Sequence, residues 1–222
     1  MIVLLCLESP RPGRASHAAL ALAGSLAGNA QVVALSAGGP RDSASLGLAR
    51  ACPALARVIH LDDATLDQAD FMTMGMVLAE AARHLGAGLV MAGERSDDEG
   101  QGLVPAALAH HLHAHLLARV RAVRLAEADD TVEVILQAGG QLCTVASPSP
   151  LVVTVPAQPG APAVPAGSAA HDVETLTLAG IGLDASRLVP RPDLLGALVP
   201  APGEPRREMT LAEAAAALAR HR

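Results

Sequence analysis

The chain has 222 residues and a formal net charge of −6, and 51% of its residues are hydrophobic whereas 17% are charged. Because phosphate neutralisation requires Lys and Arg gathered on one face, an acidic chain without a basic cluster excludes nucleic acid as the main partner. The apolar runs are too short to span a membrane, and three scattered cysteines indicate reduced thiols in the cytoplasm.

The amino-terminal half alternates between strand-like and helix-like segments. Continuous apolar runs, typical of strands buried on both faces of a parallel sheet, indicate strands at 2–7, 31–36, 57–61 and 89–92. Apolar residues at helical spacing indicate helices at 14–27, 43–52, 70–85 and 103–116. Asp42 or Ser43 is the expected cap of the second helix, and Gly86 the expected stop of the third. This alternation predicts a doubly wound, mostly parallel, Rossmann-like α/β sheet.

The pattern changes in the second half. Strands are expected at 117–125, 131–137 and 141–147 without helices between them, joined by hairpin turns at Asp129-Asp130 and Gly139-Gly140. A last apolar strand at 150–155 precedes a stretch rich in Pro, Ala and Gly, and a terminal helix is expected at 210–220. We therefore expect a nucleotide-binding-like core over 1–155, with antiparallel hairpin additions, and an extended arm over 156–222.

Three loops should meet at the carboxyl edge of the sheet, where ligands of doubly wound proteins bind: 7–13, 37–40 and 93–102. Free N–H groups at the start of the helix after Gly102 could take a phosphate. The carboxylates of Asp97, Asp98 and Glu99 could accept hydrogen bonds from ribose hydroxyls. The third loop matches neither GxxxxGK[ST] nor GxGxxG, so a solvated acidic turn remains an alternative.

Other candidate groups favour structural roles. A cluster of four histidines ends the helix expected at 103–116: His110, His111, His113 and His115. Although His111 and His115 would share a helix face, no acid or cysteine completes a metal shell, so no metal site is predicted. Phe71 is the single aromatic side chain, which excludes a stacking platform for bases. No catalytic triad or HExxH motif occurs, so we do not expect an enzyme.

Five segments, in order, resemble the β subunit of electron-transfer flavoproteins. They are VLLCLE at 3–8, VMAGERSDDEGQG at 90–102, PSPLVVTV at 148–155, PGAPAVP at 159–165 and LTLAGIGLDASRL at 176–188. Together they extend over most of the chain. One difference is a short link, ESPRPGR, where that family has a long insertion that contacts the α subunit and the flavin.

The resemblance implies an electron carrier that pairs with an α subunit holding FAD and itself holds AMP. Electrons would arrive from a flavin dehydrogenase and leave to a quinone reductase or similar acceptor. The implied cofactor-binding residues are Cys6, Leu7, Ala37, Gly38, Gly93, Ser96, Asp97, Asp98, Gly100, Gln101 and Gly102. Val164 falls at the hydrophobic anchor of the partner-recognition loop. The alternative is a stand-alone adenine-nucleotide-binding regulatory protein of the universal-stress type.

Overall fold

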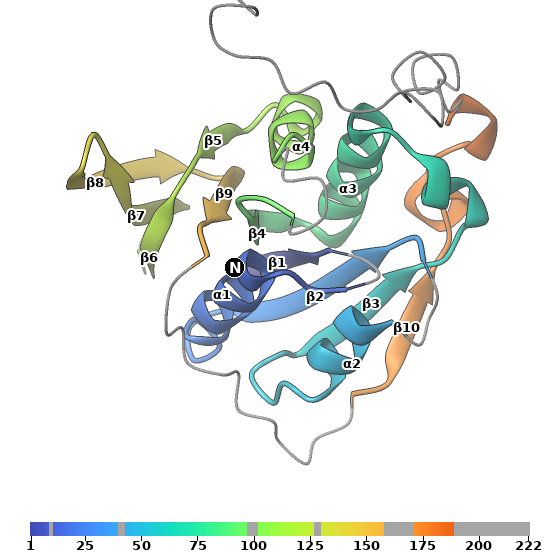
Figure 1. Ribbon diagram of the computed structural model, residues 1–222, viewed down its shortest axis with the longest axis horizontal. Helices are drawn as coiled ribbons and strands as arrows, with labels where there is room; N and C mark the ends of the chain where they lie inside the picture. The colour runs from blue at the N-terminus through green and yellow to red at the C-terminus, as the bar shows by residue number, and fades with distance from the viewer. Residues whose placement is uncertain (9–10, 40–42, 97–101, 127–129, 158–170, 189–222) are drawn as a thin grey trace, which may run out of the picture. The chain divides into compact units, whose positions relative to one another are not determined.

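A computed structural model describes residues 1–8, 11–39, 43–96, 102–126, 130–157 and 171–188 of the chain. Within these ranges one sheet has seven parallel strands in the order β10–β3–β2–β1–β4–β9–β5 (Figure 1). Its strands are β1 (Ile2–Leu7), β2 (Gln31–Ala37), β3 (Arg57–Leu61), β4 (Ala87–Gly93), β5 (His115–Leu117), β9 (Leu151–Val155) and β10 (Val173–Leu176). Strands β2 and β3 lie on one side of β1, and the chain then adds β4, β5 and β9 on the other before β10 returns to pair with β3. This reversal makes the sheet doubly wound.

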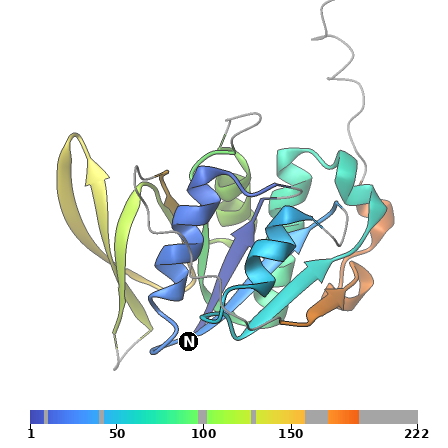
Figure 2. The ribbon, with the colours of Figure 1, turned by 60° about the horizontal axis from the view of Figure 1, so that its bottom comes forward.

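Helices cover both faces of this sheet, with α1 (Arg14–Gly24) and α2 (Ala44–Arg50) on one face and α3 (Phe71–Leu85) and α4 (Val104–Leu112) on the other (Figure 2). Alternate residues of β1 belong to the two resulting cores. Val3 and Leu5 pack on the side of α1, whereas Leu4 and Cys6 pack on the side of α3 and α4. Because both faces are buried, β1 has no polar residue.

Short side chains fix several helix ends where the sequence predicts them. The Asp70 carboxylate accepts a hydrogen bond from the Thr73 N–H at 2.7 Å, and Gly86 ends α3 in the left-handed conformation with φ 67°. The Ser43 hydroxyl accepts a hydrogen bond from the Leu46 N–H at 3.4 Å at the start of α2. These contacts confirm the expected cap of α2 and the expected stop of α3.

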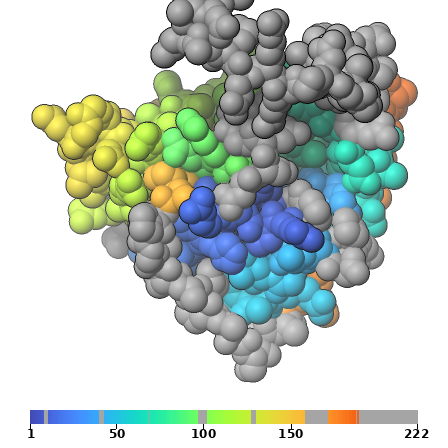
Figure 3. Space-filling model, in the orientation of Figure 1, coloured from blue at the N-terminus to red at the C-terminus, as the bar shows by residue number. Residues whose placement is uncertain are grey.

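A second sheet of three antiparallel strands contains β6 (Val120–Leu125), β7 (Thr131–Ala138) and β8 (Gln141–Pro148). One face carries buried valines that join the core beside α1, whereas β7 and β8 extend to one side, in yellow in Figure 3. Gly139 and Gly140, both with positive φ, form the expected turn between β7 and β8. The predicted fold class, a doubly wound parallel sheet with antiparallel hairpin additions, is confirmed.

The region after α4 differs from the expectation. The helix ends at Leu112 rather than at residue 116, because His113 adopts a left-handed conformation with φ 55°. The strand expected at 117–125 is in fact two strands, β5 and β6, in different sheets, and Arg119 between them has φ 61°. Pairing of β5 with β9 competes with helix continuation here. The apolar spacing of the sequence after Leu112 is compatible with a continued helix and with a strand.

Strand β10, from the part assigned to the arm, pairs in parallel with β3 at the sheet edge. Arg57 Nε and Nη2 donate hydrogen bonds to Glu174 Oε1 and Oε2 at 2.8 and 2.6 Å. These bonds lower the pKa of the Glu174 carboxyl and raise that of Arg57. A compact unit spans Met1–Pro190. The division into a core over 1–155 and an arm over 156–222 stays a prediction, and the terminal helix expected at 210–220 lies outside the described residues. None of the helices in the described ranges has the length and apolar character that a membrane crossing needs.

Candidate functional site

A cavity of about 260 Å³ lies at the carboxyl edge of the parallel sheet. Its walls come from the ends of β1, β2 and β4 and from the first turns of α1, α3 and α4. Strands β1 and β4 are neighbours in the sheet, and the strand order reverses between them. The cavity therefore occupies the position where doubly wound proteins bind their ligands.

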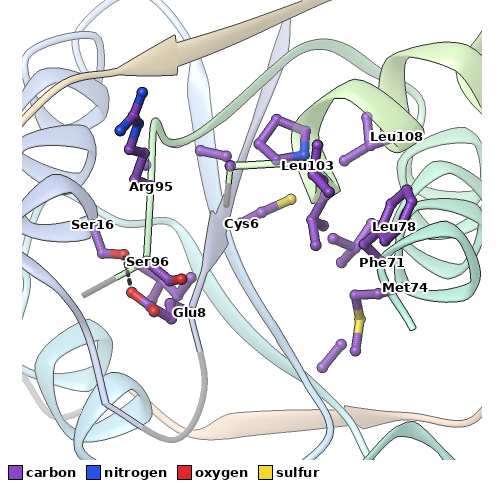
Figure 4. A pocket seen from close by; sticks show the side chains of 17 residues that line it. Cys6, Glu8, Ser16, Phe71, Met74, Leu78, Arg95, Ser96, Leu103 and Leu108 are labelled. Carbon is purple, nitrogen blue, oxygen red and sulfur yellow. Dashed lines mark hydrogen bonds between the residues drawn. The ribbon is translucent and has the colours of Figure 1, made fainter. Parts of the chain in front are cut away.

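One end of the cavity is apolar. Phe71, Met74 and Leu78 of α3 and Leu108 of α4 line it, and the Cys6 thiol points toward them (Figure 4). Burial raises the pKa of the Cys6 thiol to about 12. The thiol therefore stays protonated at neutral pH and acts as a small apolar group rather than a nucleophile. This end can accept a flat, weakly polar group.

The opposite end is polar and is built around Glu8, directly after β1. Oε2 of Glu8 accepts a hydrogen bond from the Gly13 N–H at 3.0 Å and another from Ser16 Oγ at 3.4 Å. Gly13 is the N-cap of α1 and provides no side-chain cap, so the Glu8 carboxylate lies at the amino terminus of this helix through its bonds to Gly13 and Ser16. The Ser96 hydroxyl lies beside this carboxylate (Figure 4).

Two glycines allow the backbone to close around the cavity. A Cβ atom on Gly93, at the end of β4, would lie 3.1 Å from the backbone of Ala15 and Ser16, so glycine permits the close approach of β4 and α1. Gly102 has φ +63°, and a Cβ there would lie 2.5 Å from the carbonyl oxygen of Glu94. The two ends of the 94–102 loop are thus in contact beside the cavity.

The start of α4 forms the third wall. Gly102, Leu103 and Val104 line the cavity, and Leu103, the N-cap, provides no side-chain hydrogen bond to the helix. The first turn has no acidic residue. N–H groups of a first helical turn have no partner within the helix and lie at its positive end, so this wall can receive an anion, although Pro105, which also lines the cavity, has no N–H to donate.

The structure brings together many of the site residues predicted from the sequence. Those that line the cavity are Cys6, Leu7, Ala37, Gly93, Ser96 and Gly102. Gly38 follows Ala37 but does not line the cavity. The remaining predicted residues, Asp97, Asp98, Gly100, Gln101 and Val164, lie outside the described residues. The cofactor-binding role of the whole set stays a prediction.

The sequence analysis missed several residues of the lining. Phe71, Met74, Leu78 and Leu108 form the apolar end, and Glu8 and Ser16 the polar end. The position of Glu8 directly after the first strand was an available signal, because the carboxyl edge of a parallel sheet starts there. No comparable signal exists for the helix residues, since their place depends on how α3 and α4 pack.

The histidine cluster does not have the expected geometry. His110 and His111 end α4 with their ring centroids 5.3 Å apart, whereas His113 is left-handed and His115 lies on β5. His111 and His115 therefore do not share a helix face. In the described ranges, no group of three or more His, Cys, Asp or Glu side chains could hold a metal ion.

Taken together, the doubly wound sheet and the cavity at its reversal point define a protein with the architecture of nucleotide-binding α/β domains. The sequence matches the family described as "Electron transfer flavoprotein domain" over residues 12–180, and the chain belongs to that family. A comparison with curated proteins found no match. The resemblance to electron-transfer flavoproteins is thereby confirmed at the level of the family, whose members are electron carriers rather than enzymes.

Proposed function

We propose that this chain is the β-like subunit of a cytoplasmic electron-transfer flavoprotein heterodimer. In this proposal the α subunit holds FAD, and electrons pass from a flavin dehydrogenase through that FAD to a quinone reductase or similar acceptor. The observation that carries the proposal is the family match over residues 12–180. The same match favours an electron carrier over a stand-alone regulatory protein of the universal-stress type.

The cavity fits the AMP that the resemblance implies. Its apolar end suits adenine, the hydroxyls and carboxylate of Ser16, Ser96 and Glu8 suit ribose, and the first turn of α4 suits one phosphate. Its volume of about 260 Å³ lies just below the ~300–1,000 Å³ of typical small-molecule sites, which favours a mononucleotide over a dinucleotide. AMP itself supplies no redox chemistry, so its role here is structural.

This chain then acts by positioning rather than by chemistry. The one thiol in the cavity, that of Cys6, is kept protonated by burial. The described lining has one aromatic side chain, Phe71, so it cannot hold a flavin ring between two aromatic planes. In this proposal the chain supports the flavin-binding subunit, and Val164 anchors the dehydrogenase.

Co-expression tests the assignment. The full-length chain would be produced alone and together with an electron-transfer flavoprotein α subunit from the same genome, then passed through gel filtration. We expect the chain alone to be colourless and the pair to elute as one heterodimer with a flavin absorption spectrum. A stoichiometric yellow chromophore on the chain alone, or failure of the two chains to co-elute, would contradict the proposal.

A further inference from the structure

We propose that Phe71 is a specificity-determining residue of the cavity, which favours a purine over a pyrimidine by stacking against the base. The inference rests on the proposed nucleotide-binding function. The chain has one Phe and neither Trp nor Tyr, and aromatic rings stabilise a fold most when they are buried. Phe71 is instead 42% exposed and lines the cavity. Its ring is therefore free to be covered by a ligand.

The first turn of α3 fixes the position of this ring. Asp70, directly before Phe71, caps the helix by accepting a hydrogen bond from the Thr73 N–H at 2.7 Å. Met74 and Leu78, three and seven residues after Phe71, lie on the same stripe of the helix and also line the cavity. Leu78 at one end of the stripe is buried, whereas Phe71 at the other end is exposed. The stripe thus places the ring at the mouth of the cavity.

The side chains near the ring favour stacking over hydrogen bonding to the edge of a base. Leu103 and Leu108 of α4 and the protonated thiol of Cys6 complete the apolar end of the cavity (Figure 4). One ring cannot form a platform for successive bases, but it can stack with one base, because every base has a π-face. A fused purine covers more of the ring than the single ring of a pyrimidine does.

The charged residues of the described lining lie away from this apolar end. Glu8 lies with Ser16 and Ser96, apart from Phe71 (Figure 4). Arg95 follows β4, and its Cγ would lie 3.5 Å from a Cβ atom on Gly102, so its stem passes beside the start of α4. Both charges act on the sugar and phosphate of a nucleotide. Two nucleotides that differ only in the base therefore share these contributions, and their difference in affinity isolates the contact with Phe71.

Isothermal titration of the full-length, nucleotide-free chain with AMP and with CMP tests this inference. We expect wild type to bind AMP about fivefold more tightly, because stacking strength gives modest preferences between bases. Phe71→Leu keeps an apolar side chain but removes the π-face. It should weaken AMP binding about tenfold and CMP binding only about twofold, so that the preference is lost. Met72→Ala is the matched control, since Met72 is 39% exposed but lies outside the cavity lining; its preference should equal that of wild type.

A second measurement needs no variant. Because Phe71 is the single phenylalanine, labelling the chain with isotopic phenylalanine gives one set of ring signals by NMR. Saturating AMP should shift these signals upfield, since stacking places the ring protons over the face of the base. Unchanged ring signals with AMP bound, equal affinities of wild type for AMP and CMP, or an unchanged preference in Phe71→Leu overturns the role of Phe71 alone. Failure of wild type to bind either nucleotide overturns the proposed nucleotide site as well.

Discussion

Gly102 shows how a single residue shapes the cavity. Its φ of +63° lies in the left-handed region, and a side chain there would meet the carbonyl oxygen of Glu94. A non-glycine residue in such a conformation costs about 1–3 kcal/mol. The cost falls on the contact between Gly102 and Glu94 beside the cavity rather than on the core.

We therefore expect Gly102→Ala to weaken AMP binding about tenfold, with a small decrease in melting temperature. Isothermal titration calorimetry with AMP and a thermal melt would measure the two effects. Gly28→Ala is the matched control, because a Cβ at Gly28 has open space around it. Equal AMP affinity in the two variants would show that the contact between Gly102 and Glu94 does not shape the site.

At the residue scale, position along the strands was the predictable part of the site. Cys6, Ala37 and Gly93 lie at or beside the ends of parallel strands, and such ends meet at one edge of a sheet. Phe71 and Met74 were not predictable as lining residues. Their spacing indicates a helix, but only the packed structure places the first turns of that helix over the strand ends.

At the scale of elements, the contact between α3 and α4 sets the apolar end of the cavity. A Cβ atom on Gly75 of α3 would lie 2.8 Å from the carbonyl carbon of Ala107 and from the nitrogen of Leu108 on α4. These are backbone atoms, so they cannot yield as the end of a flexible side chain would. Glycine at this position thus allows the two helices to approach each other.

We expect Gly75→Ala to destabilise the protein by about 1–3 kcal/mol, because overpacking outweighs the ~1 kcal/mol gain in helix propensity. Gly47→Ala in α2 is the control, since its Cβ would meet open space and should stabilise by about 0.5–1 kcal/mol. Urea denaturation measures both. If Gly75→Ala is as stabilising as Gly47→Ala, the close helix contact is not required.

Element boundaries were predictable where a local signal fixes them. Asp70 and Gly86 mark the two ends of α3 through a side-chain cap and a left-handed glycine. The end of α4 has no such signal. His113 takes a left-handed conformation there, and β5 forms because β9 offers a parallel partner, which is a tertiary effect.

At the scale of the whole molecule, the order of strands explains why the chain needs a linker between β9 and β10. Strand β9 lies near one edge of the sheet and β10 at the other, five strand spacings away, or about 24 Å at ~4.8 Å per spacing. The connecting stretch, 156–172, is rich in proline and joins these two strands. Val164 is the one sizeable apolar residue in its central part.

We expect Val164→Ala to slow electron transfer from the cognate dehydrogenase about tenfold, because an apolar anchor of this size contributes roughly 1–2 kcal/mol. Stopped-flow reduction of the heterodimer by the dehydrogenase would measure the rate. Its flavin content and its reduction by dithionite should match wild type. Wild-type rates in both Val164→Ala and Val164→Asp would mean that this stretch is only a linker.

The nucleotide content of the purified heterodimer tests the central claim most directly. The complex would be denatured, and the released FAD and AMP quantified by mass spectrometry against the protein concentration. The account predicts one FAD and one AMP per heterodimer. Variants of the cavity such as Gly102→Ala should contain less AMP but the same amount of FAD. Release of FAD without AMP would contradict the assignment of the cavity in this chain as a mononucleotide site.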